Sequence, residues 1–294
     1  MLIQKNDILC EHVLHKDRER VDYIVNHITD FYTEFHRYKT DKKGNKRQNK
    51  PRYTQFGVYW TRVINPPKEE LKDIQKRINA YLINNVEMPE YAYGGIKNRD
   101  NIKNALYHKG QKYVFQTDLK DFFPYITHKM VYAMYVRVGF SHDVASLLTK
   151  LTTYKGHLPQ GAPTSTTIAN LVFVPTGKKL QTIAKREGLH FTTFVDDVTM
   201  SAQKDFKHVV PEIVECIMYD GYKISHGKTT YKSGITEVTG VKLLNNSMTV
   251  TDKFSNAYSK EIDETSPRAK GMKNYKERLK KLSELKRGKV VKQI

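Results

Sequence analysis

Residues 190–201 read HFTTFVDDVTMS, and this stretch decides the fold. Apolar and β-branched residues flank Asp196 and Asp197 on both sides, which predicts two short strands joined by a turn that carries the acid pair. Two adjacent carboxylates repel one another, and they become useful when a divalent cation lies between them and a further carboxylate. An isolated Asp-Asp pair is more often a polar hairpin turn, so the metal hypothesis depends on the rest of the chain.

The further carboxylate is predicted to be Asp118. Residues 113–119, YVFQTDL, have the pattern of a strand that ends at this acid. Asp118, Asp196 and Asp197 are therefore predicted to hold two Mg²⁺ ions, with Mn²⁺ as a substitute. Ions held in this way activate an attacking 3′-hydroxyl and stabilise a leaving pyrophosphate.

Around these strands, helical and strand patterns mix without regular alternation, which favours an α+β fold with an antiparallel sheet backed by helices. Apolar spacing predicts helices over residues 3–39, 68–83 and 128–152, from Thr164 to a kink or end near Pro175 and Gly177, and from Arg268 onward. Strand-like patterns cover residues 53–64, 241–244 and 248–251.

The charge balance indicates a polyanionic partner. The chain has 50 Lys and Arg residues against 31 Asp and Glu, a formal charge of +19, and the basic residues occur along its whole length. Residues 40–52, TDKKGNKRQNKPR, predict a loop that can contact phosphate. Cys10 and Cys216 lack metal-ligand spacing, and no apolar run suits a signal peptide or a membrane span. We therefore expect a cytoplasmic protein that has no zinc site and does not contact a membrane.

Three segments carry a family resemblance. TDLKDFFPYI (117–126), LPQGAPTSTTIAN (158–170) and FVDD (194–197) occur in the order and spacing of the palm motifs of reverse transcriptases, which this chain resembles. NALYH (104–108) and VTG (238–240) are similar to patterns that precede and follow the palm in the bacterial retron type. The resemblance covers roughly residues 53–245. Phe194 stands where the family usually has Tyr, which leaves the metal ligands intact and is expected to alter fidelity or template grip.

The resemblance implies a right-hand polymerase fold with fingers, an antiparallel-sheet palm and a short helical thumb. On this basis we expect N-terminal helices and fingers over residues 1–110. The palm is expected over 111–245, with a fingers insertion near 128–158. A short basic thumb or C-terminal segment is expected over 246–294.

The same resemblance assigns residues to the site. The backbone carbonyl of Leu119 adds a metal ligand beside Asp118. Phe123 is the steric gate whose ring excludes a 2′-hydroxyl, although Phe122 and Phe123 could both be core residues. Gln160 lies beside the incoming nucleotide, although LPQG is also an ordinary turn before a helix.

Cations are expected at the triphosphate. The resemblance places Arg62 and Lys97 in the fingers and makes Lys228 the motif D lysine that protonates the leaving pyrophosphate. Arg99 competes with Lys97 for its role. With 50 basic residues in the chain, a solvated surface position is the ordinary alternative for each of them.

Two further regions are predicted to bind RNA. Asn104 and His108 lie four residues apart, on one face of a helix, and are interpreted as a scaffold or RNA-binding feature. The C-terminal helix, with Arg268 and Lys270 near its start, is predicted to present a basic surface to a structured RNA, against the alternative of an unspecific basic tail. Its apolar stripe is predicted to pack on the palm or thumb and consists of Met272, Tyr275, Leu279, Leu282 and Leu285.

The resemblance implies an RNA-directed DNA polymerase of retron type. Such an enzyme uses a dedicated structured non-coding RNA as template and primer, consumes dNTPs and makes an RNA–DNA product, in anti-phage defence beside an effector protein. A homo-oligomer is left open. One alternative is a non-retron defence reverse transcriptase that uses another RNA or a protein primer. The other is a catalytically inactive RNA-binding scaffold, against which the three intact acids argue.

Overall fold

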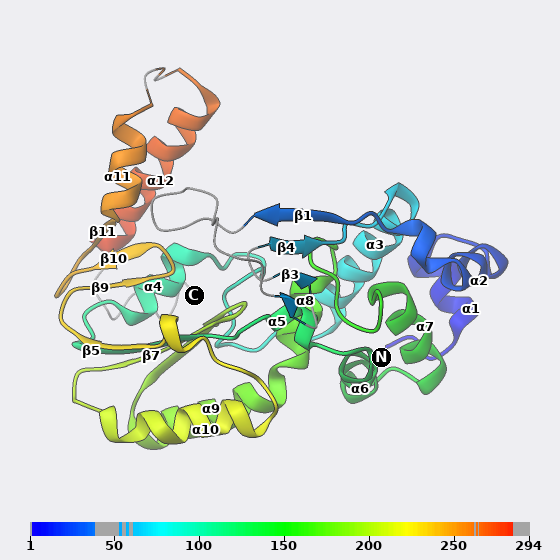
Figure 1. Ribbon diagram of the computed structural model, residues 1–294, viewed down its shortest axis with the longest axis horizontal. Coiled ribbons are helices and arrows are strands. Elements are labelled where there is room, and N and C mark those ends of the chain that lie inside the picture. The colour runs from blue at the N-terminus through cyan, green and yellow to red at the C-terminus, as the bar shows by residue number, and fades with distance from the viewer. Residues whose placement is uncertain are drawn as a thin grey trace. The chain divides into compact units, whose positions relative to one another are not determined.

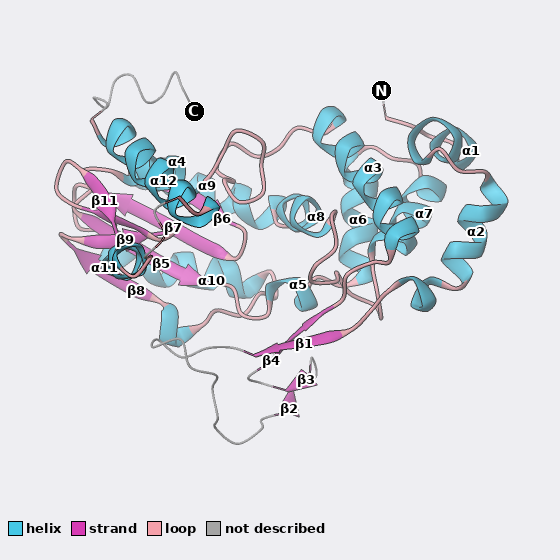
Figure 2. Ribbon diagram, turned by 90° about the horizontal axis from the view of Figure 1, so that it is seen from above, coloured by secondary structure: helices cyan, strands magenta, loops and turns pink. Residues whose placement is uncertain are grey.

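The computed structural model describes residues 2–38, 53–54, 57–58, 61–261, 263 and 265–284 (Figures 1 and 2). Two compact units make up the chain. The first comprises Met1–Met88 and Asp121–Phe173, and the second comprises Pro89–Lys120 and Val174–Ile294. Each unit joins two separate stretches of sequence. The division into residues 1–110, 111–245 and 246–294 stays a prediction.

The first unit is mainly helical. Its helices are α1 (Asn6–Leu9), α2 (Arg18–Asn26), α3 (Glu69–Asn85), α5 (Phe122–Tyr125), α6 (His128–Val138), α7 (His142–Thr152) and α8 (Ser165–Val172), with a π-helical turn at Cys10–Leu14 and a 3-10 turn at Ile28–Phe31. Strand β1 (Phe35–Tyr38) pairs antiparallel with β4 (Thr61–Ile64), and β2 (Tyr53–Thr54) pairs with β3 (Gly57–Val58). The predicted stripe of α3 is confirmed, because Leu71, Ile74, Ile78 and Leu82 are all buried. The basic segment 40–52 lies outside the described residues.

The predictions of two long, continuous helices in this unit are wrong. The helix predicted over 3–39 breaks at His15, whose φ of 50° is left-handed, and α2 restarts after Asp17, whose side chain accepts a bond from the Arg20 amide. Residues 35–38 then form a strand. The helix predicted over 128–152 ends at Gly139 with φ 110°, and Ser141 caps α7. Caps and left-handed residues satisfy backbone groups at helix ends, and they override continuous apolar spacing.

The second unit contains the central sheet. Strands β5 (Tyr113–Asp118), β6 (His190–Phe194), β7 (Asp197–Ala202) and β8 (Thr230–Ser233) are antiparallel in the order β6-β7-β5-β8. Helices α9 (Val174–Glu187) and α10 (Val210–Tyr219) cover one face, and α4 (Asn101–His108) lies against the other (Figure 1). The predicted strand ending at Asp118 and the predicted hairpin around the acid pair are both confirmed. The helix from Thr164 ends at Val172, before Pro175, as its sequence predicts.

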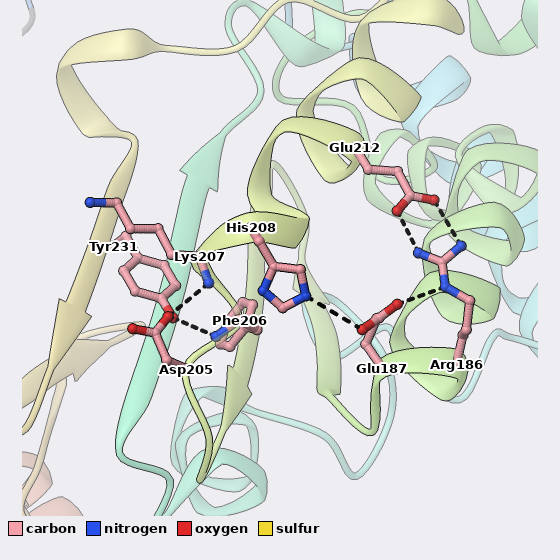
Figure 3. A network of polar contacts seen from close by, with 8 residues as sticks. All are labelled: Arg186, Glu187, Asp205, Phe206, Lys207, His208, Glu212 and Tyr231. Carbon is pink, nitrogen blue, oxygen red and sulfur yellow. Dashed lines mark hydrogen bonds and ion pairs between the residues drawn. The ribbon is translucent and has the colours of Figure 1, made fainter.

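Surface ion pairs connect α9 and α10. The Arg186 guanidinium forms hydrogen bonds with both carboxylate oxygens of Glu212 and with Glu187 (Figure 3). On β8, the edge strand of the central sheet, the Tyr231 hydroxyl donates to Asp205 at 2.7 Å. Exposed pairs of this kind contribute little individually. The residues of these pairs form none of these bonds with Asp118, Asp196 or Asp197, so they are suitable positions for control substitutions.

A second, three-stranded sheet completes this unit. Strands β9 (Thr236–Val238), β10 (Val241–Leu243) and β11 (Met248–Val250) are followed by α11 (Asp252–Ser259) and α12 (Pro267–Ser283), and α12 lies against β11 (Figures 1 and 2). Leu279 of α12 is buried with residues of α4 and the sheet, and Tyr275 and Leu282 pack beside it. The predicted apolar stripe is confirmed at these three positions, while Leu285 lies outside the described residues. None of the helices in the described ranges combines the length and apolar character that crossing a bilayer requires.

Candidate active site

The register of the central sheet brings two acids together. Asp118 at the end of β5 is the direct antiparallel partner of Asp197 at the start of β7. Directly opposed residues on antiparallel strands have Cβ atoms about 5 Å apart. Phe194 pairs with Asp197 across the hairpin, which leaves Val195 and Asp196 as a two-residue turn. The Asp196 carbonyl accepts a hydrogen bond from the Leu119 amide at 2.8 Å, so this turn is fastened to the end of β5.

The turn holds an unfavourable backbone conformation. Val195 has φ 59°, which is costly for a β-branched residue and is usually left to glycine in such hairpins. The segment that ends at Gly94 runs beside β6, where the Tyr93 amide donates to the Thr193 carbonyl at 2.8 Å. A Cβ atom on Gly94 would lie 2.5 Å from Val195 Cγ2 and 2.7 Å from its amide nitrogen. Gly94 therefore permits a close contact with the turn, and the Gly-Gly pair at 94–95 was the signal that sequence reasoning missed.

Asp118 is held on both carboxylate oxygens. It is 7% exposed. The Ser225 hydroxyl donates to Oδ2 at 2.7 Å, and the Lys228 ammonium forms an ion pair with Oδ1. The Lys120 amide donates to the Lys223 carbonyl at 2.7 Å. Because the peptide bond between Leu119 and Lys120 is trans, the Leu119 carbonyl points in the opposite direction, away from Lys223. The sequence predicted Lys228 as a proton donor to the pyrophosphate, not as a partner of Asp118, and it did not indicate Ser225, which follows no recognisable local pattern.

Asp197 has an unusual protonation equilibrium. Burial, followed by the charges of Asp196 and Asp118, raises the pKa of its carboxyl to about 7, while Lys228 opposes the shift. The carboxylates are thus crowded beyond what their surroundings neutralise, which a bound cation would correct. Carboxylate oxygens are also the ligands that Mg²⁺ prefers, so the donor set fits a divalent cation.

The side chains of the three acids do not converge on a common point where a metal ion could bind. Within the described ranges, no group of three or more His, Cys, Asp or Glu side chains is placed so that it could hold a metal ion as it stands. The two Asp118 oxygens face Ser225 and Lys228 instead. A cation that binds Asp118 would therefore have to displace the Lys228 ammonium from Oδ1.

The first unit contains three of the residues predicted to contact the nucleotide: Phe123, Gln160 and Arg62. Phe122 is buried against Phe173, whereas Phe123 is half-buried, so the two aromatics do not share a core position. The Gln160 carbonyl accepts from the Asn65 amide at 2.8 Å. This bond joins the LPQG turn to the chain just after β4, the strand that carries the exposed Arg62. The gate, nucleotide and triphosphate roles of these residues stay predictions.

The structure separates Lys97 from its competitor Arg99. The Arg99 guanidinium donates to the carbonyls of Pro89, Glu90 and Ala92, and it lies 5.7 Å from the centre of the Tyr93 ring. It is thus committed to holding its own loop. Lys97 is exposed in the same loop, and a role at the triphosphate stays a prediction for it.

Asn104 and His108 are completely buried, at 0% exposure. The ring nitrogens of His108 bond the hydroxyls of Ser201 and Thr192 at 2.6 and 2.7 Å, and burial lowers its pKa to about 3. Asn104 donates to the Thr239 hydroxyl at 3.2 Å, which brings the NALYH and VTG patterns into contact. Side chains that are so completely buried cannot contact RNA in this conformation. The geometry therefore favours the scaffold interpretation over direct RNA binding.

The basic C-terminal residues lie on an exposed face. Arg268 forms an ion pair with Glu261 at 3.3 Å, and Lys270 is exposed on α12. Several more basic residues of the helix are exposed: Lys273, Lys276, Lys280 and Lys281. Their binding to RNA stays a prediction, and the last ten residues lie outside the described part of the chain.

Comparison with known proteins places these features in a family. Residues 46–263 match the family described as reverse transcriptase (RNA-dependent DNA polymerase). The chain is similar to the Retron Se72 reverse transcriptase of Salmonella heidelberg (strain 579083-10), with 34% identity over 190 residues, 64% of this chain and 46% of the relative. It is similar to the Retron Ec86 reverse transcriptase of Escherichia coli, with 31% identity over 194 residues, 65% of this chain and 57% of the relative. The chain spans about half the length of these curated relatives.

A solved structure supports the fold. Apo telomerase from Candida tropicalis, truncated from its C-terminal domain, matches with a TM-score of 0.50 and 10% identity, over 79% of this chain and 59% of that chain. This likeness confirms the polymerase fold expected from the motifs, and the retron relatives confirm the resemblance of the sequence. Members of this family generally use divalent metal ions. With the family match extending over residues 46–263 and including all three acids, the chain belongs to the reverse transcriptase (RNA-dependent DNA polymerase) family.

Proposed function

We propose that this chain is an RNA-directed DNA polymerase of retron type that works with two Mg²⁺ ions, for which Mn²⁺ can substitute. The observation that carries the proposal is the register of Asp118 opposite Asp197, with Asp196 in the adjoining turn. Asp118, Asp196, Asp197 and the Leu119 carbonyl would hold the ions. When bound, the ions supply activation of the primer 3′-hydroxyl and neutralisation of the leaving pyrophosphate.

The protein's own residues would complete the reaction. With a pKa of about 7, Asp197 is partly protonated at neutral pH and would have to lose this proton to bind metal. Lys228, whose side chain is 61% exposed, reaches Asp118 from solvent and can turn its ammonium toward the pyrophosphate as a proton donor. Phe123 would exclude the 2′-hydroxyl of a ribonucleotide, and Gln160 would contact the incoming dNTP.

Positive charge would stabilise the triphosphate and the RNA. Arg62 and Lys97 are exposed and can contact phosphates, while Arg268 and Lys270 on α12 can contact the backbone of a structured RNA. Because the relatives named above are retron enzymes, the proposed template and primer is a structured non-coding RNA, and the product is RNA joined to DNA. Anti-phage defence beside an effector protein, in the cytoplasm, belongs to the same proposal, and a homo-oligomer is compatible with it.

The test is to purify the protein with its own locus and sequence the bound nucleic acid after separate RNase and DNase treatment. We expect one RNA species and DNA joined to it. Asp196→Asn with Asp197→Asn should abolish Mg²⁺-dependent synthesis and leave RNA binding intact, because these acids hold metal and not RNA. Asp205→Asn, an exposed acid beside Tyr231, serves as the matched control. Undiminished synthesis by the double variant would contradict the metal assignment, and DNA attached to protein would favour a non-retron enzyme with a protein primer.

A further inference from the structure

Ser225 contacts Asp118, the acid proposed to bind metal, although the sequence did not predict Ser225 as part of the site. Its hydroxyl donates to Asp118 Oδ2 at 2.7 Å, and its amide donates to the Asp118 carbonyl at 2.8 Å. One residue therefore holds both the backbone and the carboxylate of Asp118, although 107 positions of sequence separate the two.

The Ser225 backbone is itself fixed. Ile224 forms an antiparallel bridge with Leu119, which aligns this segment along the end of β5. The Ser225 carbonyl accepts the amides of Lys228 and Thr229, at 2.8 and 3.0 Å, and the Thr229 hydroxyl at 3.1 Å. With its amide and carbonyl both engaged, the residue offers its hydroxyl from a defined position.

The two partners of the Asp118 carboxylate differ in kind. Ser225 is half-buried and short, so its hydroxyl cannot move far from Oδ2. Lys228 has a long side chain that is 61% exposed, so its ammonium can leave Oδ1 at little cost. The arrangement keeps Oδ2 occupied and makes Oδ1 the oxygen that can be released to another cation.

We propose that Ser225 is a positioning residue for the metal site, which orients the Asp118 carboxylate so that Oδ1 faces the cation. This inference rests on the proposed function, because it requires Asp118 to bind metal. Hydrogen-bond partners of metal-ligating carboxylates fix their orientation, and their loss typically weakens metal affinity by about 10- to 100-fold.

The experiment compares Mn²⁺ binding, measured by electron paramagnetic resonance, for the full-length protein and its variants. Ser225→Ala should raise the Kd for Mn²⁺ by about 10-fold. Ser225→Thr keeps the hydroxyl and should stay within about 2-fold of wild type. Tyr231→Phe is the matched control, since it removes a hydroxyl–carboxylate bond of the same 2.7 Å length at Asp205, away from the site (Figure 3).

A second readout separates positioning from general damage. In DNA synthesis on an annealed primer–template, Ser225→Ala should need about 10-fold more Mg²⁺ for half-maximal rate and should regain most of kcat at saturating Mg²⁺. A merely structural defect would lower kcat at every metal concentration. If Ser225→Ala does not fold, Ser225→Cys, with a weaker donor of similar size, should show the same shift in smaller measure.

Asp118→Asn distinguishes the two ways of failing. If Asp118→Asn loses Mn²⁺ binding while Ser225→Ala and Ser225→Cys bind like wild type, the role of Ser225 is overturned and the proposed function stands. If Asp118→Asn binds Mn²⁺ like wild type, the metal site itself is wrong and the inference falls with it.

Discussion

Replacing Asp197 by Asn should stabilise the protein in metal-free solution while removing its activity. The pKa of the Asp197 carboxyl is raised from 3.8 to about 7, mainly by burial. The folded state therefore binds this proton more tightly than the unfolded chain. The stabilising contribution of the protonated carboxyl is complete below pH 3.8 and is lost as the pH rises through about 7. Asn is neutral throughout and escapes this loss.

The size of the effect follows from the two pKa values. Each pH unit between them removes about 1.4 kcal/mol from the free energy of unfolding of the wild type, so the two units from pH 5 to pH 7 remove at most about 2.7 kcal/mol. Water that reaches a partly buried carboxylate screens its charge, and we expect about half of that ceiling. For a chain of this size, 1 kcal/mol corresponds to roughly 2–4 °C in Tm. Between pH 5 and pH 7, the Tm of the variant relative to that of the wild type should therefore rise by about 2–5 °C.

The assay is thermal unfolding followed by circular dichroism, in EDTA, at pH 5, 6, 7 and 8. The gap between Asp197→Asn and wild type should widen up to pH 7 and then stay constant. Asp205→Asn is a control of opposite sign, because the Tyr231 hydroxyl and the Lys207 amide lower the pKa of Asp205. Above the unfolded pKa, its charged form stabilises the fold slightly, so the Asp205→Asn variant should be only a little less stable than wild type at pH 8. A gap for Asp197→Asn that is constant or shrinks from pH 5 to pH 8 would refute the reasoning.

Three further predictions concern residues around the site. Phe123→Ala should raise ribonucleotide over deoxynucleotide incorporation, because space for a 2′-hydroxyl opens; an unchanged ratio of the two kcat/KM values in an active variant would exclude Phe123 as the gate. Gly94→Ala should lower synthesis at least 10-fold and leave RNA affinity unchanged, since its Cβ would lie 2.5 Å from Val195 Cγ2 and displace the turn that carries Asp196; full activity would show that the turn tolerates the shift. His108→Ala should lower the free energy of unfolding by roughly 2–4 kcal/mol, because the buried hydroxyls of Ser201 and Thr192 lose their partner; denaturant titration measures this, and a loss of RNA affinity without a loss of stability would favour the RNA-binding role instead.

Local pattern was sufficient for much of the fold. The strand that ends at Asp118, the hairpin around Asp196 and Asp197, and the stripes of α3 and α12 all follow from alternation or helical spacing over a few turns of chain. Breaks inside the helices escaped prediction. A left-handed residue such as His15 or Gly139 ends a helix whatever the apolar spacing around it, because backbone hydrogen bonds and caps decide the boundary.

The sequence by itself determined that this chain carries three acids in the motifs of a reverse transcriptase, since their order and flanking residues are properties of the chain alone. Only the tertiary structure decided which atoms meet. The pairing of Asp118 with Asp197 is a matter of strand register, and the bond from Ser225 to Asp118 joins residues 107 positions apart. Likewise, only the fold buries His108, which lowers its pKa, and joins its ring to the hydroxyls of Ser201 and Thr192. Such contacts depend on how distant elements pack, and packing is a property of the whole fold that no short pattern contains.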